Sequence, residues 1–210
     1  MKKTSKDLPV VAAFDFDGTL TYRDTLLPFL IFVCGWILSM IKFATLAPTL
    51  MSYGLGKLSR QEAKECVITT FFQGMNIDEL RRHGEVFAQK RLNSLLKPEG
   101  IRRVQWHKEQ GHRCVLISAS IDVYLDSWAK SVGFDDLLAS RLATTHDDRI
   151  TGKLLGENCR GAEKTKRLDE LLGPRENYIL YAYGDSRGDQ ELLAYADRAF
   201  FRKMPILNRS

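Results

Sequence analysis

The chain has 210 residues, which suits one domain of moderate size or a core with a smaller insert. Apolar residues make up 44% of it and charged residues 27%, which excludes a disordered chain. The formal net charge of +5 fits an anionic substrate or an anionic membrane surface, and it fits an ordinary soluble protein nearly as well. We expect no nucleic-acid partner, because no dense run of Lys and Arg with interleaved aromatic residues occurs.

The cysteines and the N-terminus indicate a cytoplasmic protein. Cys34, Cys66, Cys114 and Cys159 form no CxxC pair and have no histidine at zinc-ligand spacing, so we expect reduced thiols. The N-terminal stretch MKKTSKDLPVVAAF is basic, but its apolar part is too short for a signal peptide, and Asp15 ends it.

The first expected element is a fully buried strand at 7–14, and the motif DFDGTL follows it at 15–20. Residues i and i+2 of a strand share one face, so Asp15 and Asp17 are expected to point the same way. Two neighbouring carboxylates at the end of a buried strand cost free energy unless a cation compensates them or a reaction uses both.

Residues 24–97 are expected to be helical throughout. SRQE at 59–62 and NIDE at 76–79 have the form of capping boxes, which predicts helix starts near 60 and 77. We therefore expect an α/β core formed by residues 1–23 and 98–210, with an inserted all-α cap at 24–97.

The expected cap contains an apolar stretch at 29–52. Between Pro28 and Pro48, Lys42 is the only charged residue. Polar residues recur at steps of three or four and form a narrow stripe: Ser39, Lys42, Thr45, Thr49 and Ser52. Three interpretations stay open: a helix buried in the cap, a helix that spans a bilayer, and a helix that lies on an anionic membrane surface. The last makes residues 29–60 the membrane contact, aided by Arg23, Lys42, Lys57 and Arg60.

Strand and helix patterns alternate again after residue 97. The expected elements are a helix at 97–113, a strand at 113–118, a helix at 120–134, a hairpin at 140–154 with its turn at 146–149, a helix at 163–173, a strand at 178–186, a short helix, and a strand at 198–201. Ser120 is expected to be the N-cap of the second helix and Gly133 its stop. This rhythm predicts an α/β fold with a doubly wound parallel sheet and right-handed crossovers.

Acidic and polar side chains fall where these strands end or where a helix begins. They are Asp15, Asp17, Ser118, Lys164, Asp185 and Asp189. Ligands of open α/β sheets bind beyond the carboxyl ends of the strands, so we expect these side chains to meet at one edge.

This set has one coherent chemical use. Asp15, Asp17 and Asp185 are expected to bind a hard divalent cation such as Mg²⁺ through oxygen. The cation neutralises a phosphate, so that one carboxylate can attack phosphorus while the other transfers protons.

Two further residues are expected to hold the remaining phosphate oxygens, namely Ser118 and Lys164. Each has a neighbour of the same type. Ser120 competes with Ser118, and Lys166 and Arg167 lie close to Lys164 in the sequence.

The ordered motifs DFDGTLT, VLIS, Lys164 and YGDSRGD resemble those of the haloacid dehalogenase (HAD) superfamily, over most of residues 9–201 outside the insert. The resemblance implies that Asp15 is a nucleophile that forms an aspartyl-phosphate. It implies that Asp17 is the general acid/base, with its backbone carbonyl on Mg²⁺, and that Asp185 is a metal ligand. The other implied roles are phosphate binding by Ser118, Lys164, Ala119 and Gly18, support by Asp189 and Ser186, and substrate contact by Asp24 and Ser120.

The place of the insert, between the first and second motifs, is that of a type 1 cap and is similar to phosphoserine phosphatases. Asp24 stands about where those enzymes have a glutamate, and Ser118-Ala119-Ser120 stands in place of their Ser-Gly-Gly, which argues against phosphoserine. The chain more closely resembles phosphatidylglycerophosphatase C-like members, which carry an apolar stretch in the same insert and a segment similar to NCRGAEKTKRL.

These resemblances imply a Mg²⁺-dependent phosphomonoesterase that acts on a lipid phosphate such as phosphatidylglycerol phosphate. They place it in the cytoplasm, peripheral on or anchored in the cytoplasmic face of the inner membrane. Three alternatives stay open: a phosphatase of a small soluble metabolite, a phosphotransferase, and a non-enzymatic membrane-binding module.

Overall fold

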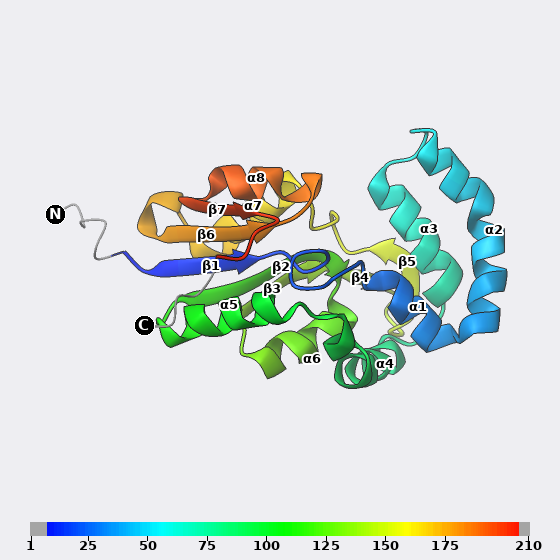
Figure 1. Cartoon of the computed structure of the whole chain (residues 1–210). Coiled ribbons are helices and arrows are strands. Elements are labelled where there is room, and N and C mark those ends of the chain that lie inside the picture. The colour runs from blue at the N-terminus through cyan, green and yellow to red at the C-terminus, as the bar shows by residue number, and fades with distance from the viewer. Residues whose placement is uncertain (1–7, 206–210) are drawn as a thin grey trace.

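A parallel five-stranded sheet forms the centre of the fold in the computed structural model, which describes residues 8–205 (Figure 1). Its strand order is β3-β2-β1-β6-β7. The strands are β1 (Val10–Phe14), β2 (Arg113–Ile121), β3 (Asp136–Ser140), β6 (Ile179–Gly184) and β7 (Arg198–Phe201). The chain adds β2 and β3 on one side of β1 and β6 and β7 on the other, which confirms the predicted α/β class and doubly wound sheet.

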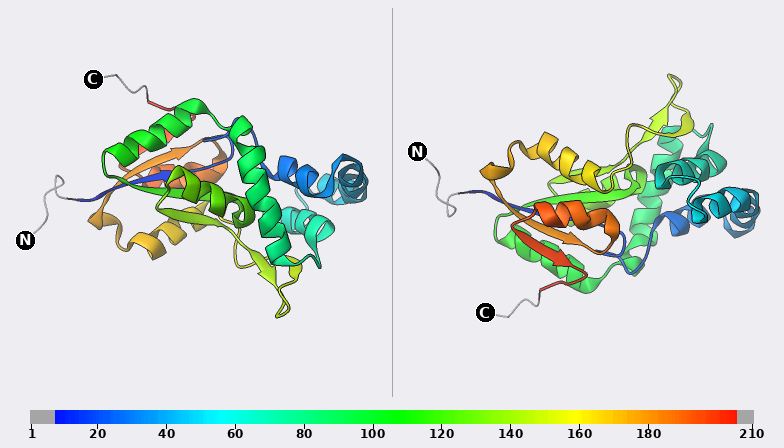
Figure 2. Two further views of the ribbon diagram at one scale, coloured as in Figure 1. Left: turned by 90° about the horizontal axis from the view of Figure 1, so that it is seen from below. Right: turned by 90° about the horizontal axis from the view of Figure 1, so that it is seen from above.

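Helices cover both faces of the sheet (Figures 1 and 2). They are α5 (Pro98–Glu109) and α6 (Asp122–Val132) on one face, and α7 (Ala162–Leu172) and α8 (Gln190–Tyr195) on the other. Along β1, Ala12 and Phe14 join the core under α5 and α6, whereas Val11 and Ala13 join the core under α7 and α8. Burial on both faces explains why the central strands read as continuous apolar runs.

Two details of the sheet differ from the prediction. Ser120 is not the N-cap of α6: it is a buried residue of β2, which continues to Ile121, and Ile121 is the N-cap. The hydroxyl of Ser120 is bonded to Asp17 and is therefore not available to cap a helix. Gly133 ends α6 as predicted, with φ of +86°. Strand β3 was not predicted, because its sequence DLLAS is short and begins with an acid.

The insert is built of helices, as predicted. They are α1 (Leu26–Cys34), α2 (Trp36–Gly54), α3 (Arg60–Phe72), α4 (Ile77–Lys90) and the 3₁₀ helix η1 (Leu92–Leu95). Ser59 and Glu62 form the predicted capping box of α3. The Asn76 side chain caps α4 by accepting hydrogen bonds from the backbone of Asp78 and Glu79.

The apolar stretch is two helices rather than one. Gly35, with φ of +76°, separates α1 from α2 in a backbone conformation that favours glycine. Among the described residues, 8–205, no helix is both long and apolar enough to cross a membrane.

The first two residues of the polar stripe on α2, Ser39 and Lys42, point toward the interior of the insert. Ser39 is buried, and Lys42 donates to the carbonyls of Thr70 and Phe71 on α3, at 2.8 and 3.1 Å. Apolar side chains face outward instead: Trp36 is 64% exposed, Ile37 78% and Ile41 58%. The stretch is therefore divided: Phe29, Leu30 and Leu46 are buried in the core, whereas the outer face of α2 is exposed.

The predicted hairpin joins the C-terminal half of the chain to the insert. It consists of β4 (Leu142–Thr144) and β5 (Ile150–Leu154), which pair antiparallel. Glu65 of α3 accepts hydrogen bonds from Lys153 Nζ at 2.9 Å and from the backbone of Leu154 at 3.2 Å. The hairpin thus fixes α3 relative to the sheet.

Candidate active site

The carboxyl end of β1 faces a pocket of about 360 Å³. It lies at the point where the chain turns to opposite sides of the sheet, the place where doubly wound folds bind ligands. The pocket is lined by Asp15, Asp17, Gly18, Tyr22, Arg23, Asp24, Ser118, Ala119, Arg160, Lys164, Asp185, Ser186, Gly188 and Asp189. Every predicted site residue except Ser120 lines it.

Asp15 and Lys164 form a buried ion pair at the base of the pocket. Lys164 Nζ lies 2.6 Å from Asp15 Oδ1, 2.7 Å from Asp189 Oδ1 and 3.0 Å from the carbonyl oxygen of Ile117. The second oxygen of Asp15 accepts a hydrogen bond from Thr19 at 3.0 Å. Burial raises the pKa of Asp15 to about 6, although Lys164 opposes this shift. Asp15 is therefore held in place but is only weakly stabilised as an anion.

Asp17 is held by a separate group of hydroxyls. Its Oδ1 accepts from the backbone N–H of Thr25 at 2.9 Å and from the Thr25 hydroxyl at 2.7 Å, and its Oδ2 accepts from Ser120. Burial, followed by the charge of Asp24, raises the pKa of Asp17 to about 7. A carboxyl group with this pKa can give and take a proton near neutral pH, as a general acid and base must.

Asp15 and Asp185, two of the three residues predicted to hold a cation, lie in one acidic cluster with Asp189, whereas the Asp17 carboxylate accepts hydrogen bonds from Thr25 and Ser120. Oxygen atoms of Asp15, Asp185 and Asp189 all lie within 4.8 Å of one another. Asp189 uses both oxygens in the protein: one meets Lys164, and the other accepts from the Ser186 backbone at 3.0 Å and the Ser186 hydroxyl at 2.8 Å. Burial and the charge of Asp189 raise the pKa of Asp185. The surroundings thus disfavour the Asp185 anion, and a cation at this cluster would compensate its charge.

Gly18 is required next to this acidic group. Its φ of +81° is one that residues with a side chain seldom adopt, and a Cβ atom there would collide with the Asp185 carboxylate. The glycine of the DFDGTL motif therefore lets Asp185 approach the end of β1.

Residues 118–120, at the C-terminal end of β2, are held by hydrogen bonds on both sides. The Ser118 hydroxyl oxygen accepts from the backbone of Ser120 at 3.0 Å, which leaves its hydrogen available to a ligand. The Ala119 carbonyl accepts from the Ser140 hydroxyl at 2.8 Å. Ser120 itself does not line the pocket and acts on Asp17 instead.

Several cationic residues near the site were not predicted as site residues. Arg23 and Arg160 line the pocket, where they add positive charge beside Lys164. Lys64, from α3, donates to the Ala119 carbonyl and to Asn158 Oδ1, the latter at 3.1 Å. Nothing in the spacing of Lys64 distinguishes it from a solvated helix lysine. Only the packing of α3 against the hairpin strand β5 brings it to the site.

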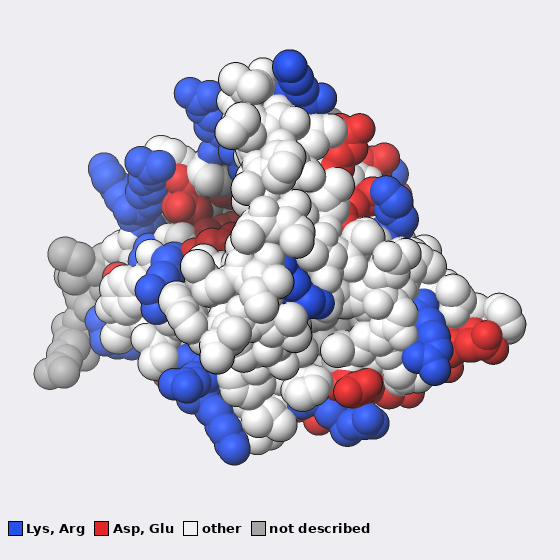
Figure 3. Space-filling model, turned by 90° about the vertical axis from the view of Figure 1, so that its right-hand side faces the viewer, with Lys and Arg blue, Asp and Glu red and all other residues white. Residues whose placement is uncertain are grey.

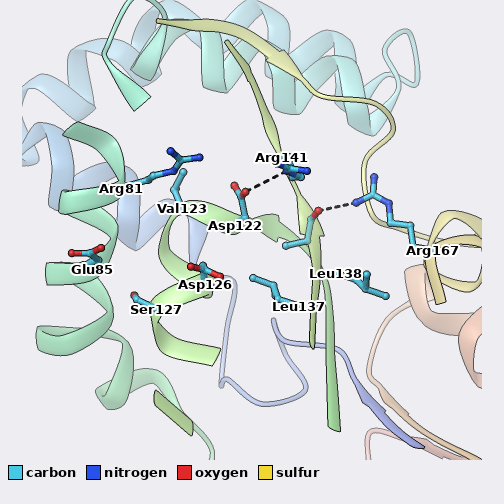
Figure 4. A pocket seen from close by; sticks show the side chains of 11 residues that line it. Arg81, Glu85, Asp122, Val123, Asp126, Ser127, Leu137, Leu138, Arg141 and Arg167 are labelled. Carbon is cyan, nitrogen blue, oxygen red and sulfur yellow. Dashed lines mark hydrogen bonds and ion pairs between the residues drawn. The ribbon is translucent and has the colours of Figure 1, made fainter. Parts of the chain in front are cut away.

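A second cavity, of about 590 Å³, lies between α4, α6 and β3 and shares no residue with the first (Figure 4). Its charged side chains neutralise one another. Asp122 lies 3.8 Å from Arg141, and Arg167 donates to the carbonyl of Ala139 at 2.7 Å. The nucleophile and proton donor predicted from the sequence are all in the first pocket.

The doubly wound α/β fold and the side chains of the pocket define this protein as an enzyme. The model of the haloacid dehalogenase-like hydrolase family matches residues 12–194, and the chain belongs to this family. This membership confirms the predicted superfamily and the predicted enzyme class, a hydrolase. The chain is 35% identical over 196 residues to protein CicA of Caulobacter vibrioides, which covers 92% of this chain and 86% of CicA.

Solved structures share the fold at lower identity. A protein with unknown function from Bordetella pertussis Tohama I has a TM-score of 0.77 and 23% identity, covering 91% of this chain and 89% of that one. The phosphoserine phosphatase of T. onnurineus has a TM-score of 0.58 and 21% identity, covering 93% of this chain and 84% of that one. A phospho-aspartyl intermediate analogue of phosphoserine phosphatase has a TM-score of 0.57 and 19% identity, covering 90% and 84%.

Proposed function

We propose that the protein is a Mg²⁺-dependent phosphomonoesterase that works through an aspartyl-phosphate. The main observation behind this proposal is that two neighbouring acids have different partners. Lys164 holds Asp15 at the base of the pocket, whereas Thr25 and Ser120 hold Asp17. One acid is oriented as a nucleophile and the other has a pKa near neutrality.

In the first step, Asp15 attacks phosphorus, the bond from phosphorus to the ester oxygen breaks, and Asp17 gives a proton to that oxygen. In the second step, Asp17 takes a proton from water as the water oxygen attacks phosphorus and the Asp15 carboxylate leaves. Ser118, Lys164 and the backbone around Ala119 hold the phosphate oxygens in both steps.

Asp15, Asp185 and the Asp17 carbonyl would hold Mg²⁺, which when bound would neutralise charge between the phosphate and the acids. In this proposal, residues 24–97 form a cap over the site. Arg23 and Arg160 attract the phosphate dianion by charge.

Asp15→Asn tests the mechanism. We expect turnover of para-nitrophenyl phosphate with Mg²⁺ to fall by about 10⁴-fold or more, because the amide cannot form the aspartyl-phosphate. The variant should stay folded, because the buried Lys164 keeps Asp189 as an ion-pair partner, and a thermal melt at pH 8 checks this. Asp126→Asn, at an exposed acid on α6, is the control and should keep full activity. An Asp15→Asn variant with wild-type turnover would refute the mechanism.

We also propose a lipid phosphate, such as phosphatidylglycerol phosphate, as the substrate, presented at an anionic membrane surface. The outward apolar side chains of α2 support this choice over a small soluble phosphometabolite. Hydrolysis of phosphatidylglycerol phosphate in vesicles, compared with soluble phosphoesters, decides between them. Adding glycerol as a competing acceptor reveals any phosphotransferase activity as a new phosphoester.

A further inference from the structure

An apolar groove of about 640 Å³ runs along α1 beside the phosphate pocket. It is lined by Arg23, Asp24, Leu27, Pro28, Ile31, Phe32, Phe87, Arg91, Ser94 and Leu95. Six of its ten lining residues carry apolar side chains, and the other four are polar or charged. Among the apolar ones, Phe32 of α1 and Phe87 of α4 pack with their ring centroids 5.5 Å apart. Its volume is within the range of small-molecule sites.

The groove adjoins the phosphate pocket. Arg23 and Asp24 line both cavities. Asp24 also accepts a hydrogen bond from the backbone of Leu26 at 2.9 Å and thereby fixes the start of α1. A ligand whose phosphate lies at Asp15 would therefore reach the groove past Arg23 and Asp24, the two residues that both cavities share.

The position of the proton donor also places the leaving alcohol near the groove. Asp17 gives its proton to the oxygen that leaves, so the alcohol departs on the Asp17 side of the phosphate. On that side Asp17 is bonded to Thr25, the residue just before α1. The leaving alcohol thus emerges at the mouth of the groove.

We propose that this groove binds a hydrocarbon chain carried by the alcohol of the phosphomonoester. The inference rests on the proposed phosphatase function and adds to it the place where the hydrocarbon part of an amphiphilic monophosphate lies. A polar alcohol would leave Ile31, Phe32 and Phe87 without a partner, whereas a chain covers them and removes apolar surface from water.

The test uses alkyl monophosphates from ethyl to octyl, each below the concentration at which it forms micelles. A fully buried methylene contributes about fourfold to binding, and a groove open on one side provides about half of that burial. We expect kcat/KM to rise about twofold with each added methylene. Equal kcat/KM across the series would overturn the inference but leave the phosphatase standing, whereas no hydrolysis of any member or of para-nitrophenyl phosphate would refute both.

A matched pair of variants locates the chain. Leu27→Asn alters the groove, and Ile37→Asn makes a similar change outside it. Both residues are second in their helix and exposed, at 48% and 78%, and asparagine adds no charge near the phosphate. We expect Leu27→Asn to lower the octyl-to-ethyl ratio of kcat/KM by about three- to tenfold and Ile37→Asn to leave it unchanged. An unchanged ratio in a folded Leu27→Asn variant would overturn the groove assignment.

Phosphatidic acid in phosphatidylcholine vesicles is the second arm. If Leu27→Asn lowers turnover of phosphatidic acid, the groove takes the chain from a bilayer. If it affects only the dissolved alkyl phosphates, the groove takes a free amphiphile. Both results support the groove, whereas the absence of any effect in both arms would overturn it.

Discussion

At the scale of single residues, the site is built from charges that cost free energy to bury. Lys164, Asp15 and Asp189 are all buried, and Lys164 bridges the two acids at 2.6 and 2.7 Å. An apolar trio of similar size is often as stable as such a cluster or more so. The charges are therefore better explained by chemistry than by stability: Lys164 fixes the nucleophile and keeps a positive charge where the phosphate arrives.

Gly18→Ala tests the contact between β1 and Asp185. A Cβ atom at Gly18 displaces the Asp185 carboxylate, and its φ of +81° strains alanine by about 1–2 kcal/mol. We expect the Mg²⁺ concentration for half-maximal activity to rise about tenfold or more. Gly111→Ala, with φ of +72° and no atom within 4 Å of the added Cβ, is the control. It should lower stability similarly and leave the Mg²⁺ dependence unchanged; an equal effect of both variants on Mg²⁺ would contradict the role of Gly18.

At the scale of elements, α3 connects the insert to the site. Lys64 projects from it to the Ala119 carbonyl and to Asn158, and Glu65 binds the hairpin on the other side. Burial lowers the pKa of Lys64 to about 8, against the attraction of Asp17 and Asp24. The contact between insert and sheet thus contains a lysine that titrates within an accessible pH range.

Lys64→Met tests this contact through the pH dependence of stability. In the unfolded chain Lys64 keeps its proton to about pH 10.4, whereas in the folded protein it loses it near pH 8. Between these values the unfolded state binds more protons, so the Lys64 contribution to stability rises with pH. We expect the free energy of unfolding of wild type, measured in urea, to gain on the order of 1 kcal/mol relative to Lys64→Met from pH 7.5 to 9.5. A difference that does not change with pH would contradict the lowered pKa.

Some elements could be predicted from local signals and others could not. The capping box at Ser59 and the stop at Gly133 depend on near neighbours in the sequence, so both could be predicted. Strand β3 and the role of Ser120 depend on the partner that each meets, β2 in one case and Asp17 in the other. Lys64 reaches the site only through tertiary packing, across 55 positions of the chain, and no local pattern reports it.

At the scale of the whole molecule, the insert presents an uncharged face. Figure 3 shows a broad band of uncharged residues down the side formed by α2, with Lys and Arg near its ends. Exposed apolar side chains occur from the first turn of α2 to just past its end: Trp36, Ile37, Leu38, Met40, Ile41, Leu50, Met51 and Leu55. No acidic residue occurs between Asp24 and Glu62, whereas the basic residues Lys57 and Arg60 follow α2. An apolar face with basic residues and no acids is complementary to an anionic lipid surface.

Sedimentation with vesicles tests this surface in the intact protein. We expect binding to vesicles rich in phosphatidylglycerol, weaker binding to phosphatidylcholine vesicles, and a loss of binding as salt screens the basic residues. Replacing Trp36 and Ile37 together by serine should weaken binding about tenfold or more, because each side chain contributes about 1.5–3 kcal/mol when fully buried. The double variant should keep its melting temperature, since both side chains face outward.

Phe201→Ser is the control for exposed apolar surface in general, since Phe201 is exposed on β7, outside the insert. It should bind vesicles as the wild type does. If the double variant and the wild type bind equally, α2 is not the membrane contact, and a lipid phosphate would have to reach Asp15 without help from this face. If binding falls only in the α2 variant, the insert that contains the groove also holds the protein at the surface from which a lipid phosphate is taken.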